Sequence, residues 1–473
     1  MNAPRESLAD LAELQALFAR QRAAFAAAPW PDATTRRNRL TRLLDVLGDE
    51  PAFVAALEQD FGHRSAHETR LAELYVVAAE IRHAQRQLAR WMRPQRVSTP
   101  LRLWPGRARV VREPRGVVGI ISPWNYPVQL ALAPVVAALA AGNRVLLKPS
   151  ELTPATSALL AERIAQRFAP EELAVVQGDA MVGAAFSELA FDHLFFTGST
   201  AVGQRVAQAA AMNLTPVTLE LGGKSPALFQ AGAHYARLAP RLMAGKLLNA
   251  GQTCIAPDYA LVAATDVDAF VAAAQAATAL LYPPASRAAD YTTVVNERHH
   301  ARLVALLDDA QRQGARIVPL FDAALPHPRA LVPTLVVGVS DGMAIMREEI
   351  FGPLLPVEAY DGIDDAIARI NARPHPLALY WFGGEGAALE RVLHETRAGG
   401  VTVNDTLWHF AHEGLPFGGI GASGYGAYHG EHGFRTFSHD KPVFSQPRFA
   451  FGALLRPPYG AAFERVLRLL ERL

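Results

Sequence analysis

The thiol of Cys254 is the side chain of this sequence best suited to covalent chemistry. Cys254 is the only cysteine in the chain, so an internal disulfide and a four-cysteine metal framework are both excluded. A lone thiol can simply be a small buried hydrophobe. However, the small residues around it, in Asn249-Ala-Gly-Gln-Thr-Cys-Ile-Ala-Pro257, would let a ligand reach the sulfur. We therefore consider it a candidate nucleophile.

A carboxylate in a glycine-rich motif is the candidate partner of this thiol. Glu220 lies in the segment Leu219-Glu-Leu-Gly-Gly-Lys-Ser-Pro226. A free thiol ionises near pH ~8.5, so only a small fraction is thiolate at neutral pH and a nucleophilic cysteine needs help. Glu220 could take a proton from the sulfur or from a nearby water molecule.

The composition indicates a globular protein with more than one domain. The chain has 473 residues, of which 50% are hydrophobic and 19% charged, and it is too long for one compact core. The 46 basic and 45 acidic side chains nearly cancel, so we expect neither nucleic acid nor an anionic membrane as a partner. The apolar stretches are too short for a membrane span and the early acidic residues argue against a secretory signal, so with a free thiol we expect a cytoplasmic protein.

The apolar pattern predicts an α/β fold with a helical beginning. Residues 1–95 have the spacing of amphipathic helices, and residues 107–112 alternate as in an exposed strand or hairpin arm. Short apolar runs then alternate with helical segments, which is typical of buried parallel strands in a doubly wound sheet. These runs are Val117–Ile121, Arg144–Leu147, Leu173–Val176, His193–Phe196 and Val217–Leu221. A similar alternation from about residue 222 predicts a second α/β domain.

The turn after one of these runs has the features of a phosphate site. In Phe196-Thr-Gly-Ser-Thr-Ala-Val-Gly203 a predicted strand ends, Gly198 allows a close turn, and Ser199 or Thr200 can cap the helix that follows. The free N–H groups of that helix start would face a bound pyrophosphate. The same pattern also occurs as ordinary helix capping.

Two further segments differ in how well they fit a nucleotide. Lys148 and Glu151, at the end of another predicted strand, could bind the two hydroxyls of an adenosine ribose. The alternative is that Ser150 only caps the next helix. The Gly-x-Gly-x-x-Gly pattern at Gly419–Gly424 follows no buried strand, so we interpret it as a flexible loop near the substrate mouth and not as a dinucleotide site.

Six motifs, in order along the chain, resemble those of the aldehyde dehydrogenase superfamily, and the resemblance covers nearly the whole sequence. The short N-terminus, the Trp-Asn-Tyr triplet and the tail around Pro457-Pro-Tyr459 are most similar to the class 3 branch, which includes bacterial coniferyl aldehyde dehydrogenases. The motifs are Ser122-Pro-Trp-Asn-Tyr-Pro127, Leu147-Lys-Pro-Ser-Glu151, Phe196-Thr-Gly-Ser199, Leu219-Glu-Leu-Gly-Gly-Lys-Ser-Pro226, Gly251-Gln-Thr-Cys254 and Glu348-Glu-Ile-Phe-Gly-Pro353.

The resemblance implies a Rossmann-like NAD-binding domain, an α/β catalytic domain and a small β bridging and oligomerisation arm. It also implies a homodimer in which the strand-like segments Arg107–Arg112 and Gly433–Val443 cross the subunit boundary. The expected boundaries are 1–95 for the N-terminal helices of the NAD-binding domain, 96–114 for the bridging arm, 115–221 for the Rossmann-like core, 222–427 for the catalytic domain, 428–446 for a bridging and oligomerisation segment, and 447–473 for a C-terminal tail.

Carried over position by position, the resemblance also implies residue roles. Cys254 would be the nucleophile and Glu220 the general base for the deacylating water. The side-chain amide of Asn125 would share the oxyanion hole with the backbone N–H of Cys254. Tyr126 and Phe417 match positions of the substrate funnel.

The implied cofactor is NAD, with NADP also tolerated. Because Glu151 should disfavour a 2′-phosphate, NAD is the expected choice. Lys148 and Glu151 would hold the adenosine ribose, Gly198 and Ser199 would lie at the pyrophosphate, and Gly203 would keep the helix close. Glu349 would bind the nicotinamide ribose, and Phe351 would pack beside the nicotinamide ring.

The predicted reaction is NAD(P)-dependent oxidation of an aryl or other apolar aldehyde, such as coniferyl aldehyde, to the acid through a cysteine thiohemiacetal and thioester. A rival hypothesis keeps this chemistry but assigns medium- or long-chain aliphatic aldehydes. Two others are a catalytically idle relative with a structural or binding role, and a thioesterase that uses the same Cys254 and Glu220. No metal site is expected, because His63 and His67 lack a third ligand.

Overall fold

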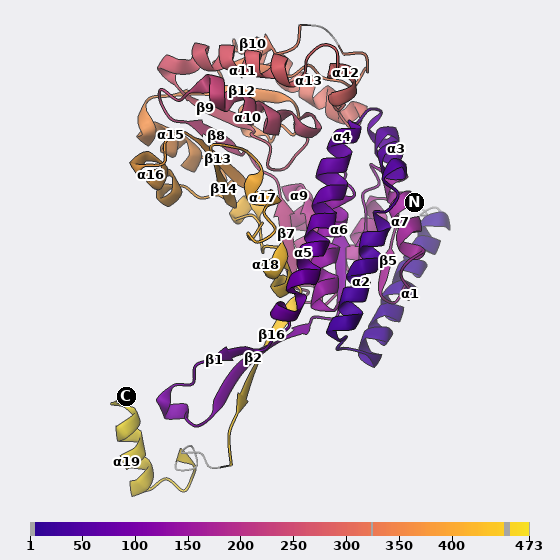
Figure 1. Cartoon of the computed structure of the whole chain (residues 1–473), viewed down its shortest axis with the longest axis vertical. Coiled ribbons are helices and arrows are strands. Elements are labelled where there is room, and N and C mark those ends of the chain that lie inside the picture. Colours follow the sequence, from indigo (N-terminus) through magenta and orange to yellow (C-terminus); the bar gives the residue numbers. More distant parts are fainter. Residues whose placement is uncertain (1–4, 323–324, 449–454, 473) are drawn as a thin grey trace.

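Three β-sheets organise the computed structural model, which describes residues 5–322, 325–448 and 455–472 (Figure 1). Residues 1–4, 323–324, 449–454 and 473 lie outside the described residues, and these include part of the expected C-terminal tail. Two of the sheets are largely parallel and form the body of the molecule, whereas the third forms an arm. The α/β fold expected from the apolar pattern is confirmed, and the exact domain boundaries stay a prediction.

The first sheet has the strand order β15-β7-β6-β3-β4-β5. All neighbours are parallel except β15, which pairs antiparallel with β7. Its strands are β3 (Val117–Ile121), β4 (Arg144–Lys148), β5 (Leu173–Val175), β6 (His193–Gly198), β7 (Val217–Leu221) and β15 (Gly424–Tyr425). The apolar runs of the sequence therefore correspond to consecutive strands of one sheet.

Helices cover both faces of this sheet. They are α1 (Arg5–Ala27), α2 (Ala33–Val46), α3 (Glu50–Phe61), α5 (Val76–Trp91), α6 (Gln129–Ala141), α7 (Pro154–Ala165), α8 (Ala180–Ser187) and α9 (Thr200–Ala211). Successive residues of one strand enter opposite cores: Val118 packs with α2, α5 and α6, whereas Val117 packs with α1, α8 and α9. Burial on both faces explains why these strands are continuous apolar runs.

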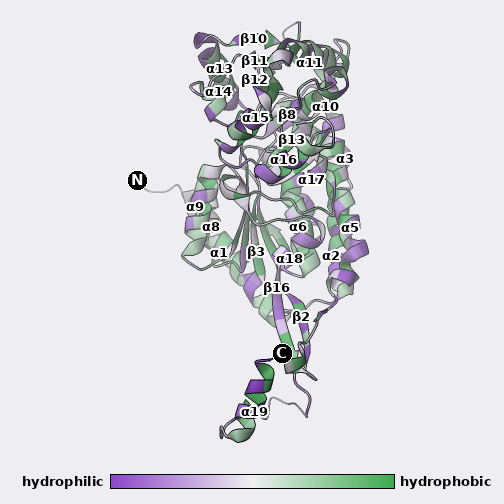
Figure 2. Ribbon diagram, turned by 90° about the vertical axis from the view of Figure 1, so that its left-hand side faces the viewer, coloured by the Kyte–Doolittle hydropathy of each residue, from purple (hydrophilic) through white to green (hydrophobic). Residues whose placement is uncertain are grey.

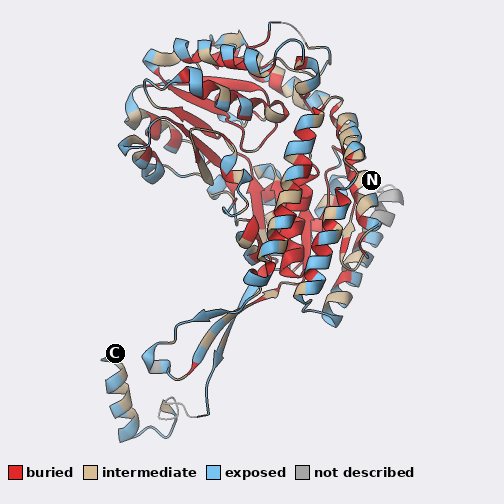
Figure 3. Ribbon diagram, in the orientation of Figure 1, coloured by how far each residue is buried: buried red, intermediate tan, exposed pale blue. Residues whose placement is uncertain are grey.

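The second sheet has the order β10-β11-β12-β9-β8-β13-β14 and is parallel except for β10. Its strands are β8 (Pro226–Phe229), β9 (Tyr259–Ala263), β10 (Arg316–Pro319), β11 (Thr334–Val337), β12 (Leu354–Tyr360), β13 (Ala378–Phe382) and β14 (Gly400–Val403). The helices around it include α10 (Tyr235–Leu247), α11 (Val267–Leu281), α13 (Glu297–Arg312), α14 (Ala344–Arg347), α15 (Gly362–Asn371) and α16 (Ala387–Glu395). In Figure 3 both large sheets are mostly buried.

The third sheet is an arm that projects from the body, as Figures 1 and 2 show in orthogonal views. It is antiparallel, in the order β1-β2-β16, and is mostly exposed (Figure 3). Its strands are β1 (Gln95–Val97), β2 (Arg107–Pro114) and β16 (Ser438–Ser445), and the helix α19 (Ala461–Leu470) lies beyond it. The expected strand at 107–112 is therefore present.

Two expectations about the C-terminal segments need correction. The segment Gly433–Val443 is not a strand throughout, because the helix α18 (Gly430–Thr436) occupies its first part. Phe434 of α18 is fully buried, so packing against the body stabilises a helix there. The Gly419–Gly424 segment is not irregular throughout: it contains a 3₁₀ turn, η5 (Gly421–Ser423), and Gly424 pairs with Glu220 of β7.

Candidate active site

The carboxyl ends of four adjacent strands of the first sheet carry most of the predicted site residues. β3 leads into the turn with Asn125, β4 ends at Lys148, β6 ends at Gly198, and β7 carries Glu220. Because these strands are parallel neighbours, their carboxyl ends meet at one edge of the sheet. The strand order reverses between β3 and β6, and open α/β sheets bind their ligands at such a switch point.

Cys254 follows an unusual turn, η3 (Leu248–Gly251), that comes after α10. Asn249, Ala250 and Gly251 have φ angles of 53°, 52° and 73°, so the chain is left-handed over consecutive residues. Such a run is energetically costly for residues with a side chain, and it persists only where surrounding contacts hold it. The turn therefore needs external support to present the half-buried Cys254.

Hydrogen bonds join the Asn125 turn to the Cys254 loop. Asn125 Nδ2 donates to the Gln252 carbonyl at 3.1 Å, and Asn249 Nδ2 donates to the Asn125 carbonyl at 2.9 Å. The Tyr126 hydroxyl lies 2.7 Å from Thr253 Oγ1, immediately before the thiol. Within the described residues the Cys254 N–H donates to no backbone carbonyl, so it is free to bind another acceptor.

A buried ion pair supports the Asn125 turn, and no motif of the sequence pointed to it. Arg64 Nη1 donates to the Asn125 carbonyl at 3.0 Å, and Arg64 Nη2 lies 3.0 Å from Glu73 Oε1. Both side chains are fully buried. Glu73 Oε2 in turn accepts from the N–H groups of Val128 and Gln129, where α6 begins.

A second buried carboxylate, Glu68, supports the left-handed turn. Glu68 Oε1 accepts from the Asn249 N–H at 3.1 Å, and Oε2 accepts from Thr292 Oγ1 at 2.6 Å. Burial raises the pKa of Glu68, although its Thr292 and Arg64 contacts oppose this; burial likewise raises the pKa of Glu73 to about 7. A π-helix, η1 (Thr69–Tyr75), connects α4 (Ala66–Glu68) to α5 here. Such π-helical segments often mark functional sites.

Glu220 is a buried carboxyl group with no hydrogen-bond partner. It is 2% exposed, and neither carboxylate oxygen has a partner in the part of the chain that the structure describes. Burial raises its pKa well above the usual carboxyl range. Burial also raises the pKa of Cys254 to about 12, and the nearby carboxylates of Glu349 and Glu220 add to this effect. The thiol therefore needs a proton acceptor, and Glu220 lies close enough to influence it.

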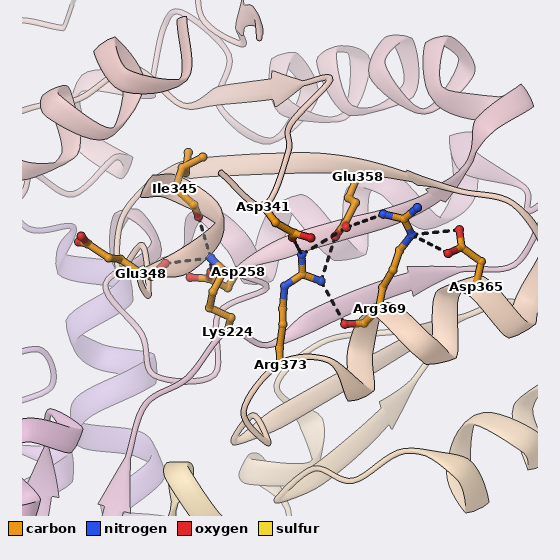
Figure 4. A network of polar contacts seen from close by, with 9 residues as sticks. All are labelled: Lys224, Asp258, Asp341, Ile345, Glu348, Glu358, Asp365, Arg369 and Arg373. Carbon is orange, nitrogen blue, oxygen red and sulfur yellow. Dashed lines mark hydrogen bonds and ion pairs between the residues drawn. The ribbon is translucent and has the colours of Figure 1, made fainter. Parts of the chain in front are cut away.

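Lys224 holds the segment that leads into Glu349 and Phe351, and Figure 4 shows its contacts with Asp258, Ile345 and Glu348. Lys224 Nζ pairs with Asp258 and donates to the carbonyls of Ile345 and Glu348 at 2.8 and 2.9 Å. The same view shows Arg369 and Arg373 around Glu358, which ties α15 to β12. The lysine of the Glu-Leu-Gly-Gly-Lys motif thus links the end of β7 to the Glu349 segment.

Glu349 lies against the end of β7. A Cβ atom at Gly222 would overlap the carboxylate oxygens of Glu349, so this approach requires glycine. Burial, with the nearby Asp258, raises the pKa of Glu349 to about 8. Phe351 follows with a φ of 52°, and its ring lies 5.4 Å from the ring of Trp124, beside Asn125. The structure therefore brings Glu349 and Phe351 to the same edge as the catalytic candidates.

The start of α9 has the geometry of a phosphate site. Ser199 is the N-cap, and its hydroxyl accepts from the Val202 N–H at 3.4 Å. The other N–H groups of the first turn can face a ligand. A Cβ atom at Gly203 would lie 2.7 Å from Leu221 Cδ2, so glycine lets α9 pack closely on β7. These features fit the pyrophosphate of a dinucleotide beside Gly198.

Lys148 and Glu151 meet at the end of β4. Lys148 Nζ lies 3.7 Å from Glu151 Oε2 and donates to the Gly178 carbonyl at 3.0 Å. Lys148 is buried, whereas Glu151 is largely exposed. The alternative that Ser150 caps the next helix is wrong, because Thr153 is the N-cap of α7. The exposed Glu151 carboxylate can therefore contact a ribose, whereas Lys148 Nζ already donates to the carbonyls of Pro149 and Gly178.

A largely apolar cavity of about 860 Å³ leads to Cys254. Residues of η1, α5, α6, α10 and the 405–413 segment line it, and so does Tyr126. Phe417 does not line it: its ring packs behind the wall, 4.9 Å from Phe410 and 5.5 Å from His429. The substrate role of Tyr126 thus has support in the structure, while that of Phe417 stays a prediction.

Neither a metal centre nor a membrane-spanning helix is found in the described part of the chain. It contains no group of three or more His, Cys, Asp or Glu residues that could hold a metal ion. His63 contacts Glu58 at 3.1 Å and the Ala289 carbonyl at 3.2 Å. No helix among the described residues is both long enough and apolar enough to cross a membrane.

The thiol lies beside an apolar cavity, and the candidate nucleotide turns lie at the strand ends of an α/β sheet, an arrangement that suits an enzyme with a nucleotide cofactor. The model of the aldehyde dehydrogenase family matches residues 5–443, and the chain belongs to this family. It is an NAD(P)-dependent aldehyde dehydrogenase. The expected family membership is therefore confirmed.

The chain is similar to several individual proteins along nearly its whole length. A probable coniferyl aldehyde dehydrogenase of Pseudomonas aeruginosa is 50% identical over 464 residues, which cover 98% of this chain and 97% of the relative. The substrate-bound structure of Staphylococcus aureus AldH is 38% identical, with a TM-score of 0.91 and coverage of 96% and 99%. A mutant of Pseudomonas syringae AldC, in complex with NAD+ and octanal, is 29% identical, with a TM-score of 0.82 and coverage of 92% and 89%.

Proposed function

We propose that the protein oxidises apolar aldehydes to carboxylic acids with Cys254 as the nucleophile. The observation that carries this proposal is the meeting of three groups at one edge of the sheet. These are the thiol in the cavity wall, the unpartnered Glu220 carboxyl and the Asn125 amide, which is hydrogen-bonded to the thiol's own loop. An idle relative would have no need for this arrangement.

The first half-reaction acylates the enzyme. Glu220 or a water takes the thiol proton, the sulfur forms a bond to the aldehyde carbon, and the carbonyl electron pair moves to oxygen. The second N–H of the Asn125 amide and the Cys254 N–H donate to this oxyanion. Bound NAD(P) supplies the hydride acceptor for the oxidation that leaves a thioester on Cys254.

The second half-reaction releases the acid. Glu220 takes a proton from a water molecule, whose oxygen attacks the thioester carbon. The carbon–sulfur bond breaks, the acid leaves, and the thiol regains a proton. Because burial raises the pKa of Glu220, its ionised form is a stronger base than an ordinary carboxylate.

The test uses the fact that Cys254 is the only thiol. Alkylation with iodoacetamide should abolish NADH production, and a bound aldehyde should slow the alkylation. Cys254→Ala should be inactive and unresponsive to iodoacetamide. Dehydrogenase activity in Cys254→Ala would contradict the proposal, and hydrolysis of thioesters by the wild type without any nucleotide would favour the thioesterase hypothesis.

The proposed substrates are aryl or other apolar aldehydes, including coniferyl aldehyde. The apolar cavity and the 50% identity to a probable coniferyl aldehyde dehydrogenase support this class. Medium- and long-chain aliphatic aldehydes are the second candidate, since an octanal complex is known for a structural relative. A comparison of kcat/KM for coniferyl aldehyde and octanal, each with NAD and with NADP, distinguishes them.

NAD is the proposed cofactor, with NADP tolerated. The Glu151 carboxylate lies beside Lys148 at the proposed ribose site, and it would repel a 2′-phosphate. Glu151→Gln should therefore raise kcat/KM with NADP relative to NAD. An unchanged ratio would place the 2′ position elsewhere.

A homodimer formed through the arm is a further part of the proposal. β16 is one of the two edge strands of the arm, and the side chains of Val97, Trp104 and Phe444 are 45%, 57% and 48% accessible. Unpaired strand edges and exposed apolar groups favour association with a second copy. A monomer in light scattering at micromolar concentration would contradict it. A cytoplasmic location stays a prediction.

A further inference from the structure

Glu80 is a buried carboxyl group in the cavity wall that the proposed reaction does not use. It lies on α5, is 5% exposed, and lines the same cavity as Cys254. Burial and the nearby carboxylate of Glu413 raise the pKa of Glu80, and no hydrogen bond from the described residues lowers it. A buried polar group without a protein partner is unfavourable, so such a group in a cavity wall can be satisfied by a ligand that enters the cavity.

His429 is a second unpartnered polar group in the same wall. It is 3% exposed, lines the cavity, and its Nε2 atom has no hydrogen-bond partner among the described residues. Burial lowers the pKa of His429 to about 3, so the ring is neutral and each nitrogen can either donate or accept. Its ring lies 4.9 Å from Phe410 and 4.4 Å from Tyr428, which fixes its position.

Glu80 lies at the inner end of the wall that η1 and α5 form. Leu71, Tyr75, Ala79 and Glu80 line the cavity at helical spacing. Leu71 and Tyr75 are 59% and 62% exposed, so they lie at the mouth, whereas Glu80 is buried. The carboxyl of Glu80 therefore lies deeper in the wall than Leu71 and Tyr75 do.

Glu80 also lies near the chemistry. Glu80 and Cys254 line the same cavity, and burial and the negative charges of Glu220, Glu80 and Cys254 all raise the pKa of the neighbouring Tyr428. A ligand that fills this cavity can therefore contact both Cys254 and Glu80. Burial and Glu413 raise the pKa of Glu80 to about 8, so the carboxyl carries its proton at neutral pH and can both donate and accept.

We propose that Glu80 and His429 bind a hydroxyl group on the aldehyde substrate, away from its reacting carbon. This inference rests on the proposed function and names the substrate class: apolar aldehydes with a hydroxyl, of which phenolic aldehydes fit the cavity. The hydroxyl donates to one of the two groups and accepts from the other. Glu413, which is half-buried in the same wall, disfavours anionic aldehydes by charge repulsion.

The test compares two aldehydes that differ only by the hydroxyl, 4-hydroxycinnamaldehyde and cinnamaldehyde. A site built to bind a hydroxyl discriminates strongly against an analogue that lacks it, so the wild type should prefer the hydroxylated aldehyde by about tenfold or more in kcat/KM. Glu80→Leu should remove most of this preference, and Glu80→Gln, which still forms hydrogen bonds, should retain part of it. The control Val76→Ala, in the same wall, should shift both kcat/KM values by a similar factor.

The outcomes separate the two proposals. Equal kcat/KM for both aldehydes in the wild type, or an unchanged preference in Glu80→Leu, would overturn the hydroxyl site while leaving aldehyde oxidation intact. No oxidation of either aldehyde would overturn the proposed function and the inference with it. If Glu80→Leu does not fold, the affinities of both aldehydes for Cys254→Ala can be measured instead, because this variant keeps Glu80 and His429 but lacks the proposed nucleophile. Tighter binding of the hydroxylated one is expected there, and equal binding contradicts the proposal.

Discussion

The nucleotide side and the substrate side of Cys254 are built in different ways. On the nucleotide side, strand ends present Lys148, Ser199 and Glu220, and backbone groups and close glycine contacts set the geometry. On the substrate side, side chains from helices far apart in the sequence line an apolar cavity. Backbone geometry tolerates little change, whereas a cavity wall can adapt. Substitutions near the strand ends should therefore affect every substrate, and those in the wall should affect particular ones.

The largest expected effect belongs to Glu220. Glu220→Gln removes the proposed base, and loss of a general base typically costs on the order of 10²–10⁴ in rate. Because the substitution leaves acylation possible, we expect a burst of about one NADH per site followed by a stall. Rapid-mixing measurements of NADH check this. Absence of the burst would show that Glu220 also activates the thiol.

The same residue predicts a pH dependence. Only the ionised carboxylate can accept a proton, and burial raises the pKa of Glu220 above its usual value of 4.5. The steady-state rate should therefore fall as the pH falls through this raised pKa, which lies above the ordinary carboxyl range. Glu220→Gln should lack this limb in a pH–rate profile. An identical limb in the variant would assign it to another group.

Asn125→Ala is expected to have the second-largest effect on the rate. The Asn125 amide donates to the Gln252 carbonyl, and the Asn125 backbone carbonyl accepts from Asn249, so the amide is preorganised for the oxyanion. Loss of one such donor typically costs on the order of 10²–10³ in kcat. Fluorescence titration should show little change in NAD affinity. Weaker NAD binding with an intact kcat would place Asn125 in the cofactor site.

Gly222→Ala should have an intermediate effect, confined to the nucleotide. The added methyl would overlap the Glu349 carboxylate and displace it. Overpacking of this kind corresponds to a loss of NAD affinity on the order of tenfold. The matched control is Gly386→Ala, where nothing lies within 4 Å of the added Cβ. Equal NAD affinity in both variants would exclude a role for Glu349 in nucleotide binding.

The smallest effect is expected at the cavity mouth. Tyr75 is 62% exposed there, so Tyr75→Ala should change KM for bulky aldehydes by roughly two- to threefold. The kcat for a small aldehyde such as propanal should not change. A large loss of kcat with propanal would show that the wall positions the catalytic loop. It would contradict the expectation that substitutions in the wall affect only particular substrates.

The strand ends could be predicted from the sequence because local pattern and chemistry coincide there. Continuous apolar runs predicted β3 and β7 with their observed bounds, because a strand that is buried on both faces has apolar side chains at consecutive positions. The residue types of Cys254, Glu220 and Ser199, with the turns around them, indicated nucleophile, base and phosphate site. These features depend on short stretches of chain and on general chemistry.

Only the tertiary structure showed what supports and shapes this site. Arg64 meets the Asn125 carbonyl, and Glu68 meets the Asn249 N–H, across separations of 61 and 181 residues that no local pattern reports. Packing places the phenyl ring of Phe417 behind the cavity wall and the carboxyl of Glu80 in it, which no motif indicated. Periodicity in a sequence reports which residues are buried, but the partner of a buried side chain is decided by how distant elements pack together.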